Sequence, residues 1–210
     1  MADTPVVNIY DKSGCARYKI LVEIVFYPLG IRNFIFRNIP IKDKDRILDA
    51  GCGYGILSKA IHDRVKKEGL VGVEQHAFDI SSDMLEAFKS TCRGADIHLR
   101  KLDVRDLSYD DNYFDLIVTS AMLEYVPNLE EALTSLKRCL RREGRIYVFM
   151  SRKSPLNDLL FRPWGNPKCY SFSELKALFL RVGFRSVVRH RFPRRFFWLN
   201  AWGVIIEGTK

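Results

Sequence analysis

Short apolar runs alternate with segments of helical periodicity along most of the chain. Strands are predicted at five places: Arg46 to Ala50, within Leu70 to Ile80, Ile97 to Leu102, Phe114 to Ser120 and Arg145 to Met150. Helices are predicted from about Ile56, Ser82 and Asn128, where apolar residues recur three and four positions apart. Alternating strands and helices indicate an α/β fold with a mostly parallel, doubly wound sheet.

Two helices carry a recognisable start signal in the sequence. Both follow the capping-box pattern, Asn128 with Glu131 and Ser171 with Glu174. The apolar stripe of the first helix is expected to persist until Gly144, and the second helix to stop at Gly183. Beyond it, the stretches Arg185 to Phe192 and Trp198 to Thr209 predict an antiparallel C-terminal hairpin, which gives seven strands in total.

Composition limits the class of protein. The chain has 210 residues, 47% hydrophobic and 28% charged, as expected for one globular domain. Its five cysteines include no CxxC pair, so neither a metal cluster nor a disulfide framework is predicted. The start of the chain lacks a signal-peptide pattern, and the apolar run from Ile24 to Ile31 is too short to span a membrane. We therefore expect a cytoplasmic location, with peripheral association at a membrane surface as an alternative.

Charge is distributed unevenly along the chain, whose net charge is +9. Residues 137–195 hold sixteen Lys or Arg and three acids, whereas residues 106–131 hold seven acids and no base. A basic C-terminal half fits an anionic partner such as RNA or a membrane surface, although a solubilising basic surface is the commoner explanation of such a pattern.

Three glycines follow the first predicted strand. Gly51, Gly53 and Gly55 allow a tight turn and a close approach of the backbone to a ligand at a helix start, which indicates a nucleotide-type ligand. The dinucleotide fingerprint requires a glycine where this chain has Ile56, and no Gly-Lys-Ser/Thr of a phosphate-binding loop follows.

The stretch from Ile47 to Gly55 resembles the first motif of the class I S-adenosylmethionine-dependent methyltransferases, an apolar strand that ends in Asp/Glu-x-Gly-x-Gly-x-Gly. The resemblance extends from about Arg46 to Met150 and more loosely to the C-terminus. It implies a Rossmann-like methyltransferase fold, S-adenosyl-L-methionine as cofactor and S-adenosyl-L-homocysteine as product. The quinone- and sterol-type, small-molecule branch is the most similar.

The resemblance also implies roles for single residues. Asp49 would hold the methionine ammonium, and Asp103 would accept a hydrogen bond from the adenine amino group. For the acid that binds the ribose hydroxyls, Asp79 is preferred to Glu74, because Asp79 begins a stretch similar to the family's strand-to-helix junction. The predicted cofactor-binding residues are Asp49, Gly51, Cys52, Gly53, Gly55, Asp79, Ile80, Asp103, Val104 and Ser120, with Cys52 as a small packing residue within the motif.

We expect a single methyltransferase domain over residues 1–210. Its parts would be an N-terminal helical cover (1–40), a cofactor-binding core (41–150), a substrate-side insertion (151–170) and a C-terminal helix and hairpin (171–210). The cover and the insertion lie outside the alternating pattern, and plain packing or connecting roles are the alternative for both.

Catalytic residues are few in methyl transfer, because the protein chiefly orients two reactants. Glu124 and Tyr125 occupy the place where many small-molecule methyltransferases of this group carry a Glu-His or His-His pair, and they are the catalytic candidates. Glu124 would orient a substrate or cap a short helix. None of the histidines is assigned a catalytic role, and no metal site is predicted.

Three functions remain open at this point. The first is methyl transfer to a small-molecule or lipid-like acceptor. The second is an RNA methyltransferase that uses the basic C-terminal half, where arginines interleave with aromatic residues between Arg185 and Trp198. The third is a cofactor-binding partner subunit without chemistry of its own. The sequence does not indicate an oligomeric state.

Overall fold

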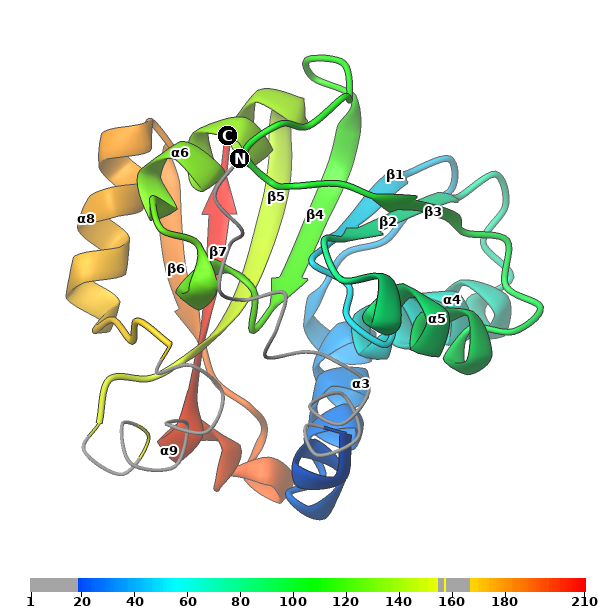
Figure 1. Ribbon diagram of the computed structural model, residues 1–210, viewed down its shortest axis with the longest axis horizontal. Helices are drawn as coiled ribbons and strands as arrows, with labels where there is room; N and C mark the ends of the chain where they lie inside the picture. Colours follow the sequence, from blue (N-terminus) through cyan, green and yellow to red (C-terminus); the bar gives the residue numbers. More distant parts are fainter. Residues whose placement is uncertain (1–18, 155–156, 158–166) are drawn as a thin grey trace.

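A computed structural model describes residues 19–154, 157 and 167–210. These residues form a seven-stranded sheet of order β3-β2-β1-β4-β5-β7-β6 (Figure 1). The strands are β1 (Arg46–Ala50), β2 (Glu74–Asp79), β3 (His98–Lys101), β4 (Phe114–Ser120), β5 (Leu140–Ser151), β6 (Ser186–His190) and β7 (Gly203–Thr209). Strands β1 to β5 pair in parallel, and β7 is antiparallel to both β5 and β6. The predicted α/β sheet with an antiparallel C-terminal end is confirmed.

Helices cover both faces of this sheet. They are α3 (Tyr27–Asn38), α4 (Ile56–Glu68), α5 (Ser82–Thr91), α6 (Leu129–Cys139), α8 (Phe172–Val182) and α9 (Leu199–Trp202), with two short 3₁₀ turns, η1 (Leu123–Tyr125) and η3 (Arg194–Phe196). α6 and α8 pack on one face, while α3, α4 and α5 lie on the other (Figure 1). Residues 19–24 form a further helical turn before α3.

The central strand β4 illustrates why its sequence is apolar almost throughout. Phe114 and Ile117 face the cluster formed with α6 and α8, whereas Leu116 and Val118 face the cluster formed with α3 and α4. All four side chains are buried. A strand covered on both faces cannot alternate apolar with polar residues, so the continuous run is the expected pattern.

The capping predictions are confirmed at both helices. Asn128 accepts a hydrogen bond from the backbone N–H of Glu131, and Ser171 with Glu174 forms the complete reciprocal capping box. α8 is followed by Gly183 in a left-handed conformation, as predicted.

The helix that begins after Asn128 ends earlier than the sequence predicts. α6 stops at Cys139, and β5 begins at Leu140, so residues 141–144 belong to the strand. Leu140 pairs with Phe114 at the start of β4, and both side chains are fully buried. The expectation that the helix persists until Gly144 is therefore wrong, because burial of Leu140 in the sheet outweighs the helical spacing.

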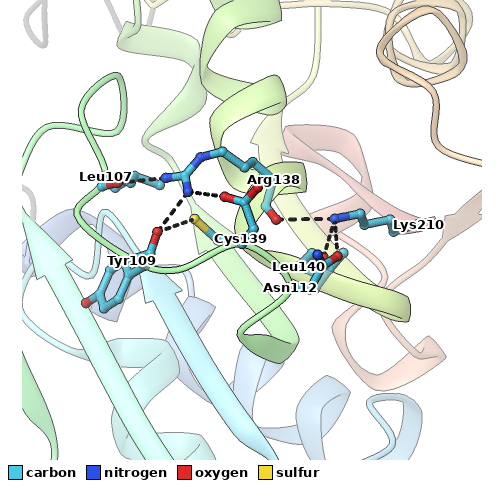
Figure 2. A network of polar contacts seen from close by, with 8 residues as sticks. Leu107, Tyr109, Asn112, Arg138, Cys139, Leu140 and Lys210 are labelled. Atoms are coloured by element: carbon cyan, nitrogen blue, oxygen red, sulfur yellow. Dashed lines mark hydrogen bonds and ion pairs between the residues drawn. The ribbon is translucent and has the colours of Figure 1, made fainter.

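The side chains of Arg138 and Lys210 form hydrogen bonds around the junction between α6 and β5 (Figure 2). Lys210 Nζ donates to the carbonyl oxygens of Arg138 and Leu140 at 3.2 and 2.6 Å. The Arg138 guanidinium donates to the carbonyl oxygens of Leu107 and Tyr109 at 2.7 and 2.8 Å. Carbonyls at the end of a helix have no partner within it, so Lys210 supplies bonds that stabilise an early end.

The C-terminal hairpin is shorter than predicted. β6 and β7 replace the expected strands Arg185 to Phe192 and Trp198 to Thr209, and η3 and α9 form between them. The Asn200 side chain accepts a hydrogen bond from the backbone N–H of Phe192 at 2.8 Å and donates to its carbonyl at 3.2 Å. Such local bonds favour a compact turn over an extended strand, and they have no signature in the apolar periodicity.

The two predicted covers are described only in part. Residues 1–18 of the N-terminal piece, and residues 155–156 and 158–166 of the piece 151–170, lie outside the described residues. No helix in the described ranges is both long and apolar enough to cross a membrane.

Candidate functional site

A pocket lies at the carboxyl ends of β1, β2 and β4. The strands that follow β1 in the sequence are first added on one side of it, as β2 and β3, and then on the other side, as β4 and β5, so the direction of strand addition reverses at β1. Ligands of open α/β sheets bind at such a reversal. This glycine-loop pocket encloses about 700 Å³, including its open mouth. Among the residues lining it are Asp49, Gly51, Cys52, Gly53, Asp79, Ile80, Ser120 and Tyr125, so most of the residues predicted from sequence lie together.

The three glycines of the loop all adopt left-handed backbone angles, with φ of 67°, 51° and 96°. A Cβ on Gly51 would lie 2.3 Å from Met122 Cγ, and one on Gly55 would lie 2.8 Å from Cys92 Sγ. A Cβ on Gly53 would meet only Met84 Sδ, at 3.9 Å. Packing thus requires glycine at the first and third positions, whereas Gly53 has open space at the pocket wall. Gly55 does not line the pocket and begins α4 behind it.

Asp49 is buried at the end of β1, between Ala77 of β2 and Val118 of β4. Its Oδ2 accepts hydrogen bonds from the backbone N–H and the hydroxyl of Ser58, at 3.0 and 2.6 Å. Its Oδ1 is buried with no partner among the described residues. Burial raises the pKa of Asp49 to about 7, against the lowering effect of the Ser58 bonds.

A cationic ligand would satisfy this carboxylate. A buried charge needs an opposite charge or hydrogen bonds, and Asp49 Oδ1 has neither from the described residues. Asp49 also binds Ser58 in the first turn of α4, so one of its oxygens caps this helix while the other has no partner among the described residues. The residues present therefore fit a ligand that carries an ammonium group.

Asp79 and Glu74 lie at opposite ends of β2. Asp79 is the last residue of the strand, and its carboxylate accepts hydrogen bonds from the backbone N–H of Gly53 at 2.8 Å and of Ser81 at 2.9 Å. Glu74 is the first residue, half-exposed beside Arg46 at 3.4 Å. Asp79 lines the pocket and Glu74 does not. Burial raises the pKa of Asp79 despite its backbone hydrogen bonds.

A smaller pocket of about 460 Å³ continues from the first and shares Gly51, Asp79 and Ile80 with it. Asp103 and Val104 line this edge pocket. The Asp103 carboxylate pairs with its neighbour Arg105 through both oxygens, the shortest contact being 2.6 Å. The hydrogen bond from Arg105 holds the pKa of Asp103 below its ordinary value. Any further donor at Asp103 must share these oxygens with Arg105.

Cys52 and Ser120 occupy different settings in the pocket wall. Cys52 is buried in a cluster with Ala77 and Phe88, and burial raises the pKa of its thiol well above the ordinary value. This agrees with a packing residue. The Ser120 hydroxyl lies 2.8 Å from the hydroxyl of Tyr27, which comes from α3.

A third pocket, the apolar pocket, adjoins the glycine-loop pocket. It encloses about 790 Å³ and shares Ala121 and Tyr125 with that pocket. Its walls come from segments far apart in sequence: Leu21, Val22, Val25 and Tyr27 from the N-terminal helices, Phe149 and Met150 from β5, and Phe192, Leu199 and Trp202 from the C-terminal region. Sequence reasoning did not identify these residues, because each reads as ordinary core in its own segment.

Glu124 is the charged group of the apolar pocket and is 3% exposed. Its Oε1 accepts hydrogen bonds from the backbone N–H and the hydroxyl of Ser151, at 3.3 and 2.7 Å. Its Oε2 is buried without a partner among the described residues. Burial raises the pKa of Glu124 to about 7. The side chain does not cap η1, so of the two roles predicted for Glu124 the capping role is wrong.

The uneven charge of the sequence is partly internal pairing. Acids of the segment 106–131 bind bases of the segment 137–195 in three ion pairs: Arg138 with Asp111, Arg141 with Asp115 and Arg181 with Glu130. Further pairs join Arg145 to Glu207 and Arg185 to Glu143. Part of the basic C-terminal half is therefore paired with acids of the same chain.

The comparisons with known proteins agree with this geometry. A family model described as a methyltransferase domain matches residues 48–148. The demethylmenaquinone methyltransferase of Lactobacillus johnsonii is 27% identical over 140 residues, covering 64% of this chain and 55% of the relative. The ubiquinone/menaquinone biosynthesis C-methyltransferase UbiE of Francisella tularensis subsp. novicida is 33% identical over 142 residues, covering 66% and 54%. The chain spans about half the length of these curated relatives.

Among solved structures, a SAM-dependent methyltransferase from Aquifex aeolicus superposes with a TM-score of 0.73. The superposition covers 93% of this chain and 97% of that one, at 15% sequence identity. Likeness at that identity concerns the fold, which is the Rossmann-like methyltransferase arrangement.

Proposed function

We propose that this chain is a class I S-adenosylmethionine-dependent methyltransferase that transfers a methyl group to an apolar small molecule of a quinone-like or lipid-like kind. The match to a methyltransferase domain and the similarity to named methyltransferases support the proposal. One observation carries the acceptor class: the apolar pocket shares Ala121 and Tyr125 with the glycine-loop pocket. The quinone-type names of the relatives support the same class. Transfer of labelled methyl into an organic-soluble product tests the proposal.

The cofactor would occupy the glycine-loop pocket and the edge pocket. Asp49 Oδ1 takes the methionine ammonium, Asp79 the ribose hydroxyls, and Asp103 the adenine amino group. The loop backbone at Gly51, Cys52 and Gly53, together with Ile80, Val104 and Ser120, completes the surroundings, and Gly55 supports the loop from behind the pocket. When bound, S-adenosylmethionine supplies an electrophilic methyl group on a sulfonium centre. Three acidic side chains along one groove match the positive and donor groups of this cofactor.

On the acceptor side, residues of this chain orient the reactants and accept a proton from the acceptor. The walls of the apolar pocket exclude water and hold an apolar ring or chain in place. Burial raises the pKa of Tyr27, so its hydroxyl stays protonated and is a hydrogen-bond donor rather than a base. Glu124, with a pKa of about 7 and an unpartnered oxygen, is suited to accept a proton from an acceptor hydroxyl.

The two alternative functions have less support. An RNA methyltransferase would use the basic C-terminal half, but part of that charge is already paired, because Arg138, Arg141 and Arg181 bind acids of the same chain. A partner subunit without chemistry would not need the buried Glu124 carboxylate in an apolar pocket next to the glycine loop. The label-transfer measurement distinguishes both alternatives, because label in RNA would indicate an RNA methyltransferase and cofactor binding without transfer would indicate a partner subunit.

Replacement of the ribose acid tests the cofactor half of the proposal. We expect Asp79→Ala to weaken S-adenosylhomocysteine binding by about 10- to 100-fold for each ribose hydrogen bond lost, since a charged hydrogen bond contributes about 1.5–3 kcal/mol. Glu74→Ala, in the same strand but at its other end, should bind as the parent does. Isothermal calorimetry measures both constants, and circular dichroism checks that Asp79→Ala remains folded. A larger effect of Glu74→Ala would show that the ribose site is misplaced.

A further inference from the structure

Five large apolar side chains are more than half exposed at one end of the molecule. They are Ile20, Ile24, Phe26, Leu29 and Phe197, with 60%, 68%, 54%, 52% and 69% of their surface exposed. The first four belong to the helical segment 19–38, and Phe197 follows η3. We call these five residues the apolar rim.

The two segments that carry the rim touch each other. Trp198 Nε1 donates a hydrogen bond to the carbonyl oxygen of Val25 at 2.9 Å, and the ring of Phe197 lies 5.8 Å from that of Trp198. The N-terminal helices and the segment from η3 to α9 lie together along the lower edge of Figure 1. The two segments that carry the rim residues therefore adjoin each other, although they are far apart in the sequence.

The backbone holds one rim residue outward at an energetic cost. Phe26 has φ of 58°, a left-handed conformation that bulky residues rarely adopt, at the break between helix 19–24 and α3. Its ring is nevertheless exposed rather than packed inside. Within the described residues, burial of the ring does not compensate for this backbone conformation, because more than half of the side chain is exposed.

Unpaired positive charge accompanies the rim. Lys19, Arg191, Arg194 and Arg195 are exposed. Within the described part of the chain, the three arginines form no ion pair with an acid, unlike Arg138, Arg141, Arg181 and Arg185. Glu23 is exposed on the same helix as Lys19 and offsets part of this charge. The surface near the rim is basic as well as apolar.

The rim adjoins the walls of the apolar pocket. Leu21, Val22 and Val25 line that pocket, while Ile20 and Ile24, on the same helical turns, are exposed. On the other segment, Phe192 and Leu199 line the pocket and Phe197 is exposed between them. The same two segments thus form the pocket wall on one side and the rim on the other.

We propose that the apolar rim docks on an anionic lipid bilayer, with Ile20, Ile24 and Phe197 inserted among the lipids and the arginines on the headgroup phosphates. Apolar side chains flanked by Lys and Arg bind the interface of anionic membranes through burial of apolar surface and through attraction between the basic side chains and the anionic headgroups. RNA fits less well, because isoleucine and leucine side chains offer no face for base stacking. Docking would bring the apolar pocket to the bilayer, so that a lipid-soluble acceptor enters without crossing water; this consequence rests on the proposed function, whereas docking itself does not.

Vesicle binding tests the proposal without any need for turnover. The full chain is co-sedimented with vesicles of phosphatidylcholine alone and of phosphatidylcholine with 30% phosphatidylglycerol, at low and high salt. We expect binding to the anionic vesicles that weakens with salt. Ile24→Ser with Phe197→Ser should reduce it at least 10-fold, and Arg194→Glu with Arg195→Glu should reduce it by a similar factor at low salt.

Matched variants away from the rim provide the controls. Val71→Ser with Leu180→Ser removes exposed apolar side chains elsewhere, and Lys66→Glu with Lys176→Glu reverses exposed charges elsewhere. Both controls should bind vesicles as the parent does. Calorimetry with S-adenosylhomocysteine should give one affinity for all variants, which separates a failure of docking from a failure of the cofactor site. Equal losses in rim and control variants, absence of vesicle binding by the parent, or binding of RNA in its place would each overturn the proposal.

Discussion

Gly53→Ala is expected to weaken binding of S-adenosylmethionine and S-adenosylhomocysteine strongly while leaving the fold intact. A Cβ at this position meets no protein atom closer than Met84 Sδ at 3.9 Å, so it would stand in the pocket space proposed for the cofactor. Overpacking of a closely fitted site costs about 1–3 kcal/mol, and the loop cannot retreat because Gly51 and Gly55 are packed against Met122 and Cys92. Calorimetry should show affinity lower by about 5- to 150-fold, and no binding of NAD to the parent.

Gly69→Ala is the matched control for this variant. Gly69 has φ of 67°, close to the 51° of Gly53, and a Cβ there has no neighbour within 4 Å. Both variants therefore bear the same backbone strain, and only Gly53→Ala fills the pocket. Parent-like cofactor affinity in Gly53→Ala, or equal losses in both variants, would show that the cofactor does not lie against the loop.

Glu124→Gln is expected to lower kcat about 100-fold at pH 8 and to leave cofactor affinity unchanged. General-base catalysis contributes about 10²- to 10⁴-fold, and glutamine keeps the size and the hydrogen bonds to Ser151 but cannot take up a proton. Because the pKa of Glu124 is about 7, the carboxylate is protonated at pH 6 and ionised at pH 8. The kcat of the parent should rise with pH through about 7, and this rise should be absent in the variant.

The pH profile distinguishes a proton acceptor from a residue that only shapes the pocket. Glu86→Gln makes the same chemical change on the exposed face of α5 and should keep the parent's kcat and pH profile. If Glu124→Gln retains the rise of kcat through pH 7, another group takes the proton, and Glu124 is a packing residue.

The sheet and the glycine loop could be predicted from the sequence because local signals determine them. The run from Phe114 to Ser120 is apolar on both faces, and the capping residues Asn128 and Ser171 act over three positions. The end of α6 could not be predicted, since it depends on Lys210 and on pairing of Leu140 with β4, both distant in sequence. Prediction of where a helix or strand ends is wrong where tertiary contacts compete with local periodicity.

The candidate site likewise has one part that could be predicted from the sequence and one part that could not. Asp49, Gly53 and Asp79 come from one continuous motif and its following strand, so their proximity follows from the parallel sheet. The apolar pocket combines residues such as Tyr27 and Trp202, which are 175 positions apart and carry no shared motif. Of the aromatic residues singled out between Arg185 and Trp198, Phe192 and Phe196 are buried and only Phe197 is largely exposed within the described chain. Packing therefore accounts for most of that pattern.

Transfer of labelled methyl from S-adenosylmethionine is the most direct test of the central claim that the apolar pocket receives the methyl acceptor. The protein is incubated with the labelled cofactor and a mixture of lipid extract and total RNA, and the label is counted after phase separation. We predict that the label appears in the organic phase, in a product that the Glu124→Gln variant forms far more slowly than the parent does. Label confined to RNA, or no transfer to either fraction by a protein that binds the cofactor, would contradict it.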